Sequence, residues 1–338
     1  MNDGILGNRM RRVGLVVGLS LLVMPALAQS QLPEALQAAI RAQGPVLGNT
    51  PEVNRQLRLL YVDDAAPRGV TALRDNSYGQ HPLQKIDVFW ARAEGGGRGG
   101  QGAAAAPAPA AAPAGPRPIV IFIHGGEMQG GDKHGVGAMD NTMVWLVQNG
   151  FVGMSMNYRL VPEINYPSAN EDIAMAINWA RKNAAAHGGD PNRIVLWGHS
   201  SGANLVADYV SHPEFHAAGP ALVAAAMFSG ARSFDLTTYG TGGGAYYTND
   251  ASKYAERSAL PGLQKSKVPL FIEYAEFDPP NILAANEMAN KVLCAASNCP
   301  AGLLKAMVHN HFTQIDTFGT RDRQISDPFL AFLKKQAP

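Results

Sequence analysis

The chain alternates short apolar segments with longer segments in which apolar residues recur every three to four positions. Turn residues bound the short segments, as is typical of strands buried on both faces of a sheet, and the longer ones have helical spacing. Strands alternating with helices predict the α/β class, with a mostly parallel sheet covered on both faces. The expected strands are 119–123, 152–156, 194–197, 222–228, 270–274 and 303–307, and the expected helices are 139–149, 169–186, 201–210 and 282–295.

Two segments depart from this alternation. Residues 94–117 are mainly Gly, Ala and Pro, which lack the side chains that could offset the entropy cost of ordering them, so we expect a disordered loop. Strand-like patterns flank it at 84–91 and 118–124, which predicts an enlarged hairpin loop. Residues 229–267, with a Gly-rich stretch at 240–244 and scattered Tyr, predict a small cap-like excursion that could cover a site.

The N-terminal segment has the three parts of an export signal. Positions 9–12 hold three Arg, residues 13–24 are apolar, and residues 26–28 form the small-residue cleavage site Ala-Leu-Ala. We therefore expect residues 1–28 to be a signal peptide cleaved after Ala28, and the protein to be periplasmic or secreted. The apolar stretch is shorter than the roughly 20 residues that span a bilayer, so no stable membrane insertion is expected. An uncleaved N-terminal anchor is the alternative.

Composition and charge limit the possible partners. The chain has 338 residues, 46% apolar and 16% charged, which suits one large core or two small ones and excludes overall disorder. Residues 1–28 carry three Arg and one Asp, so without them the formal charge of +1 falls by two to −1. A nearly neutral protein without a basic stripe is not expected to bind nucleic acid. A small, uncharged or weakly charged substrate is expected instead.

The two cysteines, Cys294 and Cys299, lie in one short segment at the end of a helical pattern. In an oxidising compartment such a pair is expected to form a local disulfide, with two free thiols as the alternative. No His or acidic residue stands beside them, so neither is expected to be catalytic.

The expected strand 194–197 runs directly into the sequence Gly-His-Ser-Ser-Gly at 198–202, and an apolar helical pattern follows. Strand, sharp turn and helix form the context of a nucleophile elbow, which holds its serine in a strained backbone conformation. Glycines stand at both ends because a side chain there would strike the neighbouring strand or helix. Ser200 is therefore the candidate nucleophile, and an ordinary turn serine is the alternative.

A serine hydroxyl needs a base to take its proton and an acid to orient that base. Glu276 and Asp278 follow the expected strand 270–274, at the edge where open α/β sheets place their sites. We favour Asp278, because the prolines after it fix the turn, whereas Glu276 is close to the strand register. A turn or N-cap aspartate is the alternative for Asp278.

Two histidines, His309 and His311, follow the last expected strand. We favour His311 as the base, with His309 either supporting it or lying in a solvated loop. The order Ser200, Asp278, His311 is that of α/β hydrolases. Glycines follow the strand 119–123, and we expect the backbone N–H groups of Gly125, Gly126 and Ser201 to form an oxyanion hole.

Five motifs follow one another: His-Gly-Gly at 124–126, Gly-Asp-Lys at 131–133, Asn-Tyr-Arg-Leu at 157–160, Gly-Gly-Asp-Pro at 188–191 and the serine motif at 198–202. They resemble the esterase/lipase branch of the α/β hydrolases, which includes hormone-sensitive-lipase-like carboxylesterases and feruloyl-esterase-like and kynurenine-formamidase-like enzymes. The resemblance runs from about Asn76 to the C-terminus. It implies the α/β-hydrolase fold and hydrolysis of a carboxylic ester, or less often an amide, without a metal or organic cofactor.

Two residues depart from the pattern of this branch. Glu127 stands where a third glycine or an aromatic is usual, and its carboxylate would oppose an oxyanion unless it points to solvent or is paired. Ser201 stands where alanine is common, and its hydroxyl could cap the helix or contact substrate.

The same residues fit other functions less well. A His-Glu-x-x-His motif is missing, and His309 with His311 lacks the further ligands that zinc needs, so no metal is expected. An amidase, arylformamidase or peptidase of the same fold is the alternative to an esterase. A binding protein of this fold is a further alternative, but such proteins usually lose the nucleophile, the histidine or the glycines that this chain keeps.

Overall fold

The computed structural model describes residues 30–61, 69–92, 115–135, 138–219, 221–230, 232–239 and 246–338. The expected signal peptide 1–28 and its cleavage site lie outside the described residues. The same holds for the expected loop 94–117 except its last three residues, of which Arg117 begins a strand. In the described ranges we find no helix with both the length and the apolar character needed to cross a membrane.

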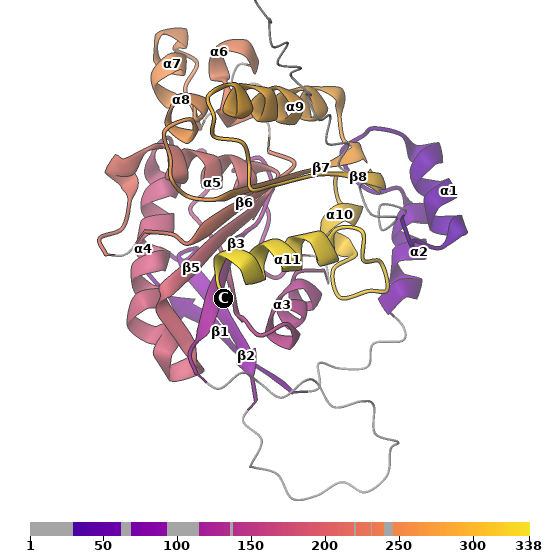
Figure 1. The fold of residues 1–338 in the computed structure, drawn as a ribbon, viewed down its shortest axis with the longest axis horizontal. Coiled ribbons are helices and arrows are strands. Elements are labelled where there is room, and N and C mark those ends of the chain that lie inside the picture. The colour runs from indigo at the N-terminus through magenta and orange to yellow at the C-terminus, as the bar shows by residue number, and fades with distance from the viewer. Residues whose placement is uncertain are drawn as a thin grey trace, which may run out of the picture.

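One sheet of eight strands forms the centre of the described structure, in the order β1-β2-β4-β3-β5-β6-β7-β8 (Figure 1). β2 pairs antiparallel with β1 and β4, and every other neighbouring pair is parallel. The predicted α/β class with a mostly parallel sheet is therefore confirmed. The strands are β1 Val70–Ser77, β2 Lys85–Ala91, β3 Arg117–Ile123, β4 Val152–Met156, β5 Gly189–His199, β6 Ala224–Phe228, β7 Leu270–Phe277 and β8 Gly302–Asn310.

The connection between β2 and β3 is not the hairpin loop that the sequence predicted. β2 pairs with β4, where Ile86 lies opposite Met156, and β3 pairs with the other edge of β4. The prediction was wrong because an alternating pattern identifies a strand and its buried face, but carries no information about which strand lies beside it.

Helices cover both faces of the sheet (Figure 1). On one face α4, α5 and α9 pack on the larger apolar cluster, and on the other α3 and α11 pack on a second cluster. Trp197 of β5 lies at the centre of the second cluster, with its ring 4.6 to 5.2 Å from those of Phe122, Phe228 and Phe329. The helices are α1 Glu34–Gln43, α2 Pro51–Tyr61, α3 Ala138–Gln148, α4 Ser168–Asn183, α5 Ser201–Ser211, α6 Leu236–Tyr239, α7 Tyr254–Arg257, α8 Leu260–Leu263, α9 Pro280–Ala295, α10 Thr313–Asp316 and α11 Ser326–Gln336.

The predicted excursion consists, where it is described, of short helices that gather beside α5 (Figure 1). Its Tyr246 and Tyr247 are buried in the larger cluster. The Tyr247 hydroxyl donates to Asp208 Oδ2 of α5 at 2.5 Å. The excursion is therefore anchored to the helix that follows Ser200.

Two N-terminal helices, α1 and α2, form a third small cluster with Leu36, Ile40 and Val53 in its core. They lie beside β8 and Phe277 (Figure 1). The side chain of Asn310 donates to Asn49 Oδ1 at 3.0 Å, which ties the link between α1 and α2 to the end of β8.

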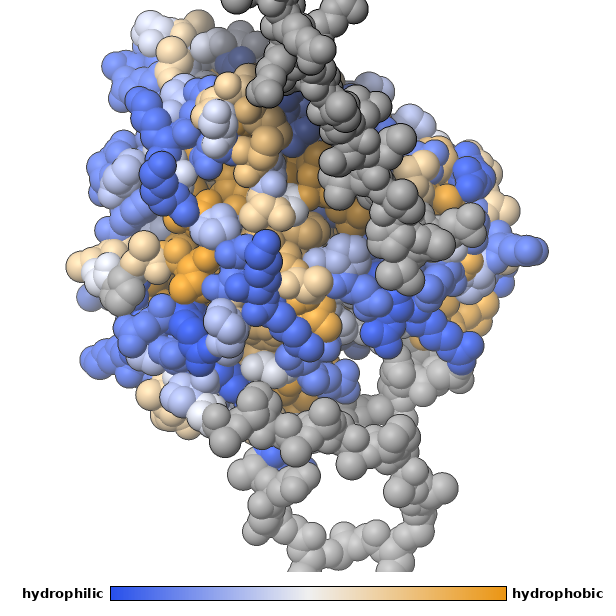
Figure 2. Space-filling model, viewed as in Figure 1, coloured by the Kyte–Doolittle hydropathy of each residue, from blue (hydrophilic) through white to orange (hydrophobic). Residues whose placement is uncertain are grey.

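Seen from the same side as in Figure 1, the molecular surface carries mostly hydrophilic residues with smaller apolar areas between them (Figure 2).

The predicted local disulfide is confirmed. Cys294, in the last turn of α9, is bonded to Cys299, just before β8. The bond closes the short connection between that helix and the edge strand.

Candidate active site

Ser200 lies in a sharp turn between β5 and α5, with a φ of 56° and a ψ of −122°. This left-handed backbone is strained for a residue with a side chain. The flanking glycines are required, because a Cβ at Gly198 would lie 2.2 Å from the carbonyl oxygen of Gly202, and one at Gly202 would lie 2.1 Å from that of Ile123. The turn therefore has the geometry expected of a nucleophile elbow.

Three side chains that are distant in sequence form one chain of hydrogen bonds. Ser200 Oγ lies 2.9 Å from His311 Nε2, and His311 Nδ1 lies 2.6 Å from Asp278 Oδ1. The side chains of His311 and Asp278 are almost completely buried. Because a carboxylate only accepts, the imidazole proton belongs on Nδ1, and Nε2 is left to accept from the serine.

The contacts of the two candidate acids differ, and so do those of the two candidate histidines. Glu276 Oε2 accepts from the backbone N–H of Val308 at 2.7 Å, whereas Asp278 contacts His311. His309 is fully buried, and its Nε2 lies 2.8 Å from Asp322 Oδ2. The expectation of a solvated loop histidine is therefore wrong, because the end of β8 points this imidazole inward.

The glycine loop after β3 passes directly beside Ser200. A Cβ at Gly125 would lie 2.8 Å from Ser200 Cβ and 3.4 Å from Ser200 Oγ. Gly126 has a φ of 121°, and a Cβ there would lie 2.2 Å from the carbonyl oxygen of Gly130. Gly125 can approach the serine this closely only because it has no side chain, whereas Gly126 allows the tight turn of the loop itself.

The two residues that departed from the resemblance are both accommodated. Glu127 is exposed, so its carboxylate is solvated. Ser201 is buried, and its hydroxyl lies beside that of Tyr158. Ser200, not Ser201, is the residue before the first turn of α5, and it makes no side-chain cap. Ser201 therefore faces the protein interior.

The motifs that follow the glycine loop hold it in place. Asn157 donates to Asp132 Oδ2 at 2.7 Å and accepts from the backbone N–H of Lys133. The buried ammonium of Lys133 lies 3.3 Å from Asp87 Oδ1 on β2. The Tyr158 hydroxyl donates to the carbonyl oxygen of His124 at 3.1 Å. These contacts tie the loop to β2 and to the segment after β4.

Three residues around this site were not singled out from the sequence: His199, Ser229 and Gln314. His199 Nε2 lies 2.7 Å from the carbonyl oxygen of His311, and burial lowers the pKa of His199 well below its ordinary value, so a neutral ring donates this bond. Ser229 donates to Asp278 Oδ2 at 2.5 Å. The available signal was that Ser229, like Ser200, directly follows an apolar strand.

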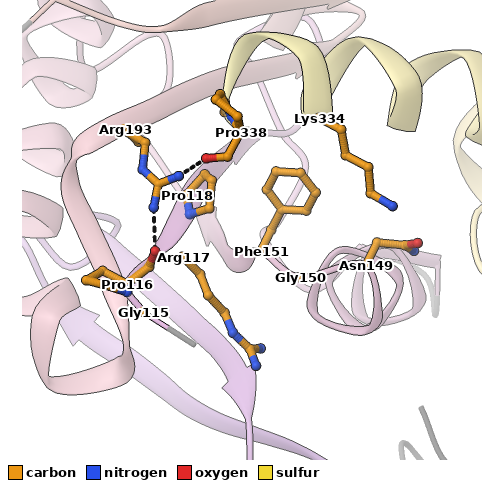
Figure 3. Close-up of a pocket in the computed structure, with 11 residues that line it drawn as sticks. Gly115, Pro116, Arg117, Pro118, Asn149, Gly150, Phe151, Arg193, Lys334 and Pro338 are labelled. Atoms are coloured by element: carbon orange, nitrogen blue, oxygen red, sulfur yellow. Dashed lines mark hydrogen bonds between the residues drawn. The ribbon is translucent and has the colours of Figure 1, made fainter. Parts of the chain in front are cut away.

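A cavity of about 340 Å³ lies away from this site, at the amino ends of β3 and β5 (Figure 3). Arg117, Arg193 and Lys334 are among its lining residues. The Arg193 guanidinium donates to the carbonyl oxygens of Pro116 and Pro338, as the dashed lines in Figure 3 show. Ser200 follows the opposite end of β5, so this cavity is separate from the candidate active site.

Sequence comparisons find relatives that match part of the chain. The family model BD-FAE matches residues 108–210. Esterase LipQ of Mycobacterium tuberculosis is 37% identical over 99 residues, which are 27% of this chain and 23% of that protein. Carboxylesterase NlhH of the same species is 38% identical over 92 residues, which are 27% of this chain and 28% of that protein. The chain thus spans about a quarter of the length of these curated relatives.

Solved structures match nearly the whole chain. Esterase B from Lactobacillus rhamnosis has a TM-score of 0.64 at 17% identity, over 90% of this chain and 94% of that one. An esterase from Pseudomonas putida has a TM-score of 0.58 at 20% identity, over 90% of this chain and 95% of that one. The chain has the α/β-hydrolase fold, and its sequence is similar to the esterase/lipase branch of that fold.

Proposed function

We propose that the protein is a carboxylic ester hydrolase that forms a covalent acyl-enzyme on Ser200. The observation that carries the proposal is the hydrogen-bonded chain from Ser200 Oγ through the His311 imidazole to Asp278, with distances of 2.9 and 2.6 Å. The residues come from the ends of β5, β7 and β8, which meet at the carboxyl edge of the sheet. The names of the similar curated proteins support the ester as the bond attacked.

In the first step, Ser200 Oγ attacks the ester carbonyl while His311 Nε2 takes its proton. Asp278 holds the proton on His311 Nδ1 and stabilises the imidazolium that forms. The tetrahedral intermediate collapses, the C–O bond to the alcohol breaks, and His311 gives its proton to the leaving oxygen. The acyl group is then bonded to Ser200.

In the second step, water replaces the alcohol. His311 takes a proton from the water, the hydroxide adds to the acyl carbon, and the acid leaves as Ser200 recovers its proton. The backbone N–H groups of Gly125, Gly126 and Ser201 are proposed to stabilise the oxyanion of both intermediates. Loss of one such donor typically raises the barrier by about 3 kcal/mol, so the glycine loop contributes on the scale of a catalytic side chain.

Covalent labelling tests whether Ser200 is an activated nucleophile. A fluorophosphonate probe should label the wild-type protein at Ser200, and Ser200→Ala should remain folded, unlabelled and without turnover. A folded wild-type protein that the probe leaves unlabelled, and that hydrolyses no ester, would favour the binding protein.

The bond cleaved is tested with a substrate panel. p-Nitrophenyl esters of increasing acyl length, an aryl formamide and a peptide anilide should be compared by kcat/KM. We expect the esters to be the better substrates. Turnover of the amides alone would replace the esterase with an amidase, arylformamidase or peptidase of this fold.

We further propose that the protein is exported, with residues 1–28 removed. The charged, apolar and small-residue parts of the N-terminus support this, as does the disulfide between Cys294 and Cys299, since disulfides persist in oxidising compartments. N-terminal sequencing of the mature protein should begin at Gln29. A mature chain that still begins at Met1 would exclude cleavage.

A further inference from the structure

We propose that Ser229 and Gln314 are positioning residues that hold Asp278 and His311 in line with Ser200. This inference rests on the proposed function, because it names further residues that the same reaction needs. Both residues lie behind the Asp278–His311 pair and neither contacts Ser200 in the hydrogen bonds described. Ser229 contacts the carboxylate of Asp278, and Gln314 contacts the main-chain carbonyl of His311.

The carboxylate of Asp278 is held at both of its oxygens. Oδ1 accepts from His311 Nδ1, while Oδ2 accepts from the Ser229 hydroxyl at 2.5 Å and from the backbone N–H of Ala275 at 2.7 Å. Hydrogen bonds to an ionised acceptor are about twice as strong as neutral ones. Two donors on Oδ2 therefore fix the carboxylate plane and direct Oδ1 toward the imidazole.

Gln314 joins this carboxylate contact to the backbone of the histidine. Its Nε2 donates to the Ser229 hydroxyl at 2.7 Å and to the carbonyl oxygen of His311 at 2.8 Å. Gln314 Oε1 also lies 3.0 Å from Ser229 Oγ, but a hydroxyl has one proton, and the closer, charged oxygen of Asp278 is the better acceptor. Four residues thus form a closed ring, which passes through both the imidazole and the main-chain carbonyl of His311: Asp278, His311, Gln314 and Ser229.

Every member of the ring is shielded from water. Gln314 and Asp278 are fully buried, and Ser229 and His311 are each 1% exposed. A buried polar group that loses its partner has no water to replace it. Removing the Ser229 hydroxyl would therefore leave Gln314 Nε2 short of a partner, and would leave the Ala275 N–H as the remaining donor described for Asp278 Oδ2, so the carboxylate would be held less firmly.

Ser229, which makes this contact, has a strained backbone conformation. Ser229 follows β6 as Ser200 follows the neighbouring β5, and both have left-handed φ values, of 51° and 56°. The two turns are joined, since Ser200 N–H donates to the carbonyl oxygen of Phe228 at 2.8 Å. A glycine at 229 would relieve this strain without supplying a hydroxyl. The serine is thus needed for its side chain, and the turn alone does not require it.

This strain provides a matched pair of variants. Ser229→Ala and Ser229→Gly both remove the hydroxyl, but only Gly accepts the left-handed backbone freely, so Ser229→Gly should have the higher Tm. If the hydroxyl positions Asp278, both variants should lose about 10- to 100-fold in kcat on the best p-nitrophenyl ester, with KM little changed. If the residue is only structural, activity will follow Tm, and the Gly variant will be close to wild type.

Ser211→Ala is the control for loss of a buried serine hydroxyl. Ser211 is 6% exposed and donates to the carbonyl oxygen of Asp208 in its own helix, at the far end of α5 from Ser200. It should lose stability and keep its kcat. Gln314→Met should lower kcat like the Ser229 variants, and Ser229→Ala/Gln314→Met should lose less than the product of the two single losses. A full product of losses would show that the two residues act independently, and would contradict the ring.

A proton NMR measurement separates this inference from the proposed function. The His311 Nδ1 proton, in a short bond to Asp278, should give a resonance far downfield that is absent in His311→Gln. It should shift or disappear in Ser229→Ala and Ser229→Gly and stay in Ser211→Ala. If the wild-type protein hydrolyses no ester, the proposed function fails and this resonance still tests the ring. An unchanged resonance together with wild-type kcat in both Ser229 variants would overturn the inference.

Discussion

His199, the residue before the candidate nucleophile, donates from Nε2 to the carbonyl oxygen of His311 at 2.7 Å. The two imidazoles lie beside each other, with their ring centres 4.8 Å apart. The elbow therefore presents Ser200 to His311 and also holds the backbone of His311. This contact gives a role to a position that the serine motif leaves open to many residues.

We expect His199→Leu to lower kcat by about tenfold, because the carbonyl oxygen of His311 keeps only Gln314 of the two side-chain donors described for it. His199→Gln retains an Nε2 donor of similar reach and should keep most of the activity. The two variants should be compared by kcat and by thermal unfolding at one pH. An equal loss of kcat in both variants would mean that the imidazole of His199, and not its hydrogen bond to His311, is required.

The same contact predicts a dependence of stability on pH. The folded protein keeps His199 neutral because burial lowers its pKa, whereas the unfolded chain binds a proton near pH 6.5. Unfolding therefore takes up a proton below that pH, and this residue makes the fold less stable as pH falls. The unfolding free energy of His199→Gln relative to wild type should increase between pH 7 and pH 5 in urea titrations.

His309 and His311 should respond oppositely to replacement. His311→Gln removes the base and should lower kcat by at least about 10³-fold. His309→Gln removes the buried contact between His309 Nε2 and Asp322 Oδ2 and should cost about 1 to 3 kcal/mol of stability, while kcat measured well below Tm stays near wild type. Loss of turnover in a folded His309→Gln protein would contradict the assignment of His311 as the only base.

Lys133 links stability to the glycine loop. Lys133→Met would leave the fully buried Asp87 with only part of its charge compensation, and should cost about 3 kcal/mol. The loop segment beside it contacts Gly125, since a Cβ at Gly131 would lie 2.3 Å from the Gly125 carbonyl oxygen, so kcat should also fall. Asp75→Asn removes the exposed partner of the same lysine and should cost under about 1 kcal/mol. Urea unfolding and kcat would test both.

Replacement of Asp208, which accepts a hydrogen bond from Tyr247, should increase the stability of the fold. Burial raises the pKa of Asp208 from 3.8 to about 7, so between these values the unfolded chain releases a proton that the folded protein keeps. This residue therefore destabilises the fold increasingly as pH rises, until the effect levels off above about pH 7. Asp208→Asn keeps an acceptor for Tyr247 and removes the titration. Its advantage should grow by about 1.4 kcal/mol per pH unit and reach at most roughly 4 kcal/mol.

The control for this prediction is Asp327→Asn, an exposed aspartate in a surface ion pair with Arg323. Its unfolding free energy should differ from wild type by under about 1 kcal/mol at every pH between 4 and 8. An Asp208→Asn difference that is equally flat with pH would show that this carboxylate is ionised in the folded protein.

The sequence by itself determined the parts of this protein that depend on neighbouring residues. Five of the expected strands and the helix after Ser200 were predicted within a few residues of their observed bounds. Four of these strands are buried on both faces, which requires a continuous apolar run, whereas β8 was expected to be buried and is an edge strand with alternating exposure. The elbow at Ser200 was also predictable, since its strain and its two glycines lie within five consecutive positions. Chain order then limited the acid to two residues and the base to two.

Only the tertiary structure decided between those candidates and arranged the rest. Glu276 and Asp278 are two residues apart, yet Glu276 accepts from the backbone of β8 and Asp278 contacts His311. The turn at the end of β7 directs the two carboxylates to these different partners. The pairing of β2 with β4, the docking of α1 and α2 at β8, and the ring through Ser229 and Gln314 all join residues distant along the chain. Local pattern encodes the burial of a residue, whereas its partner depends on how the whole chain packs.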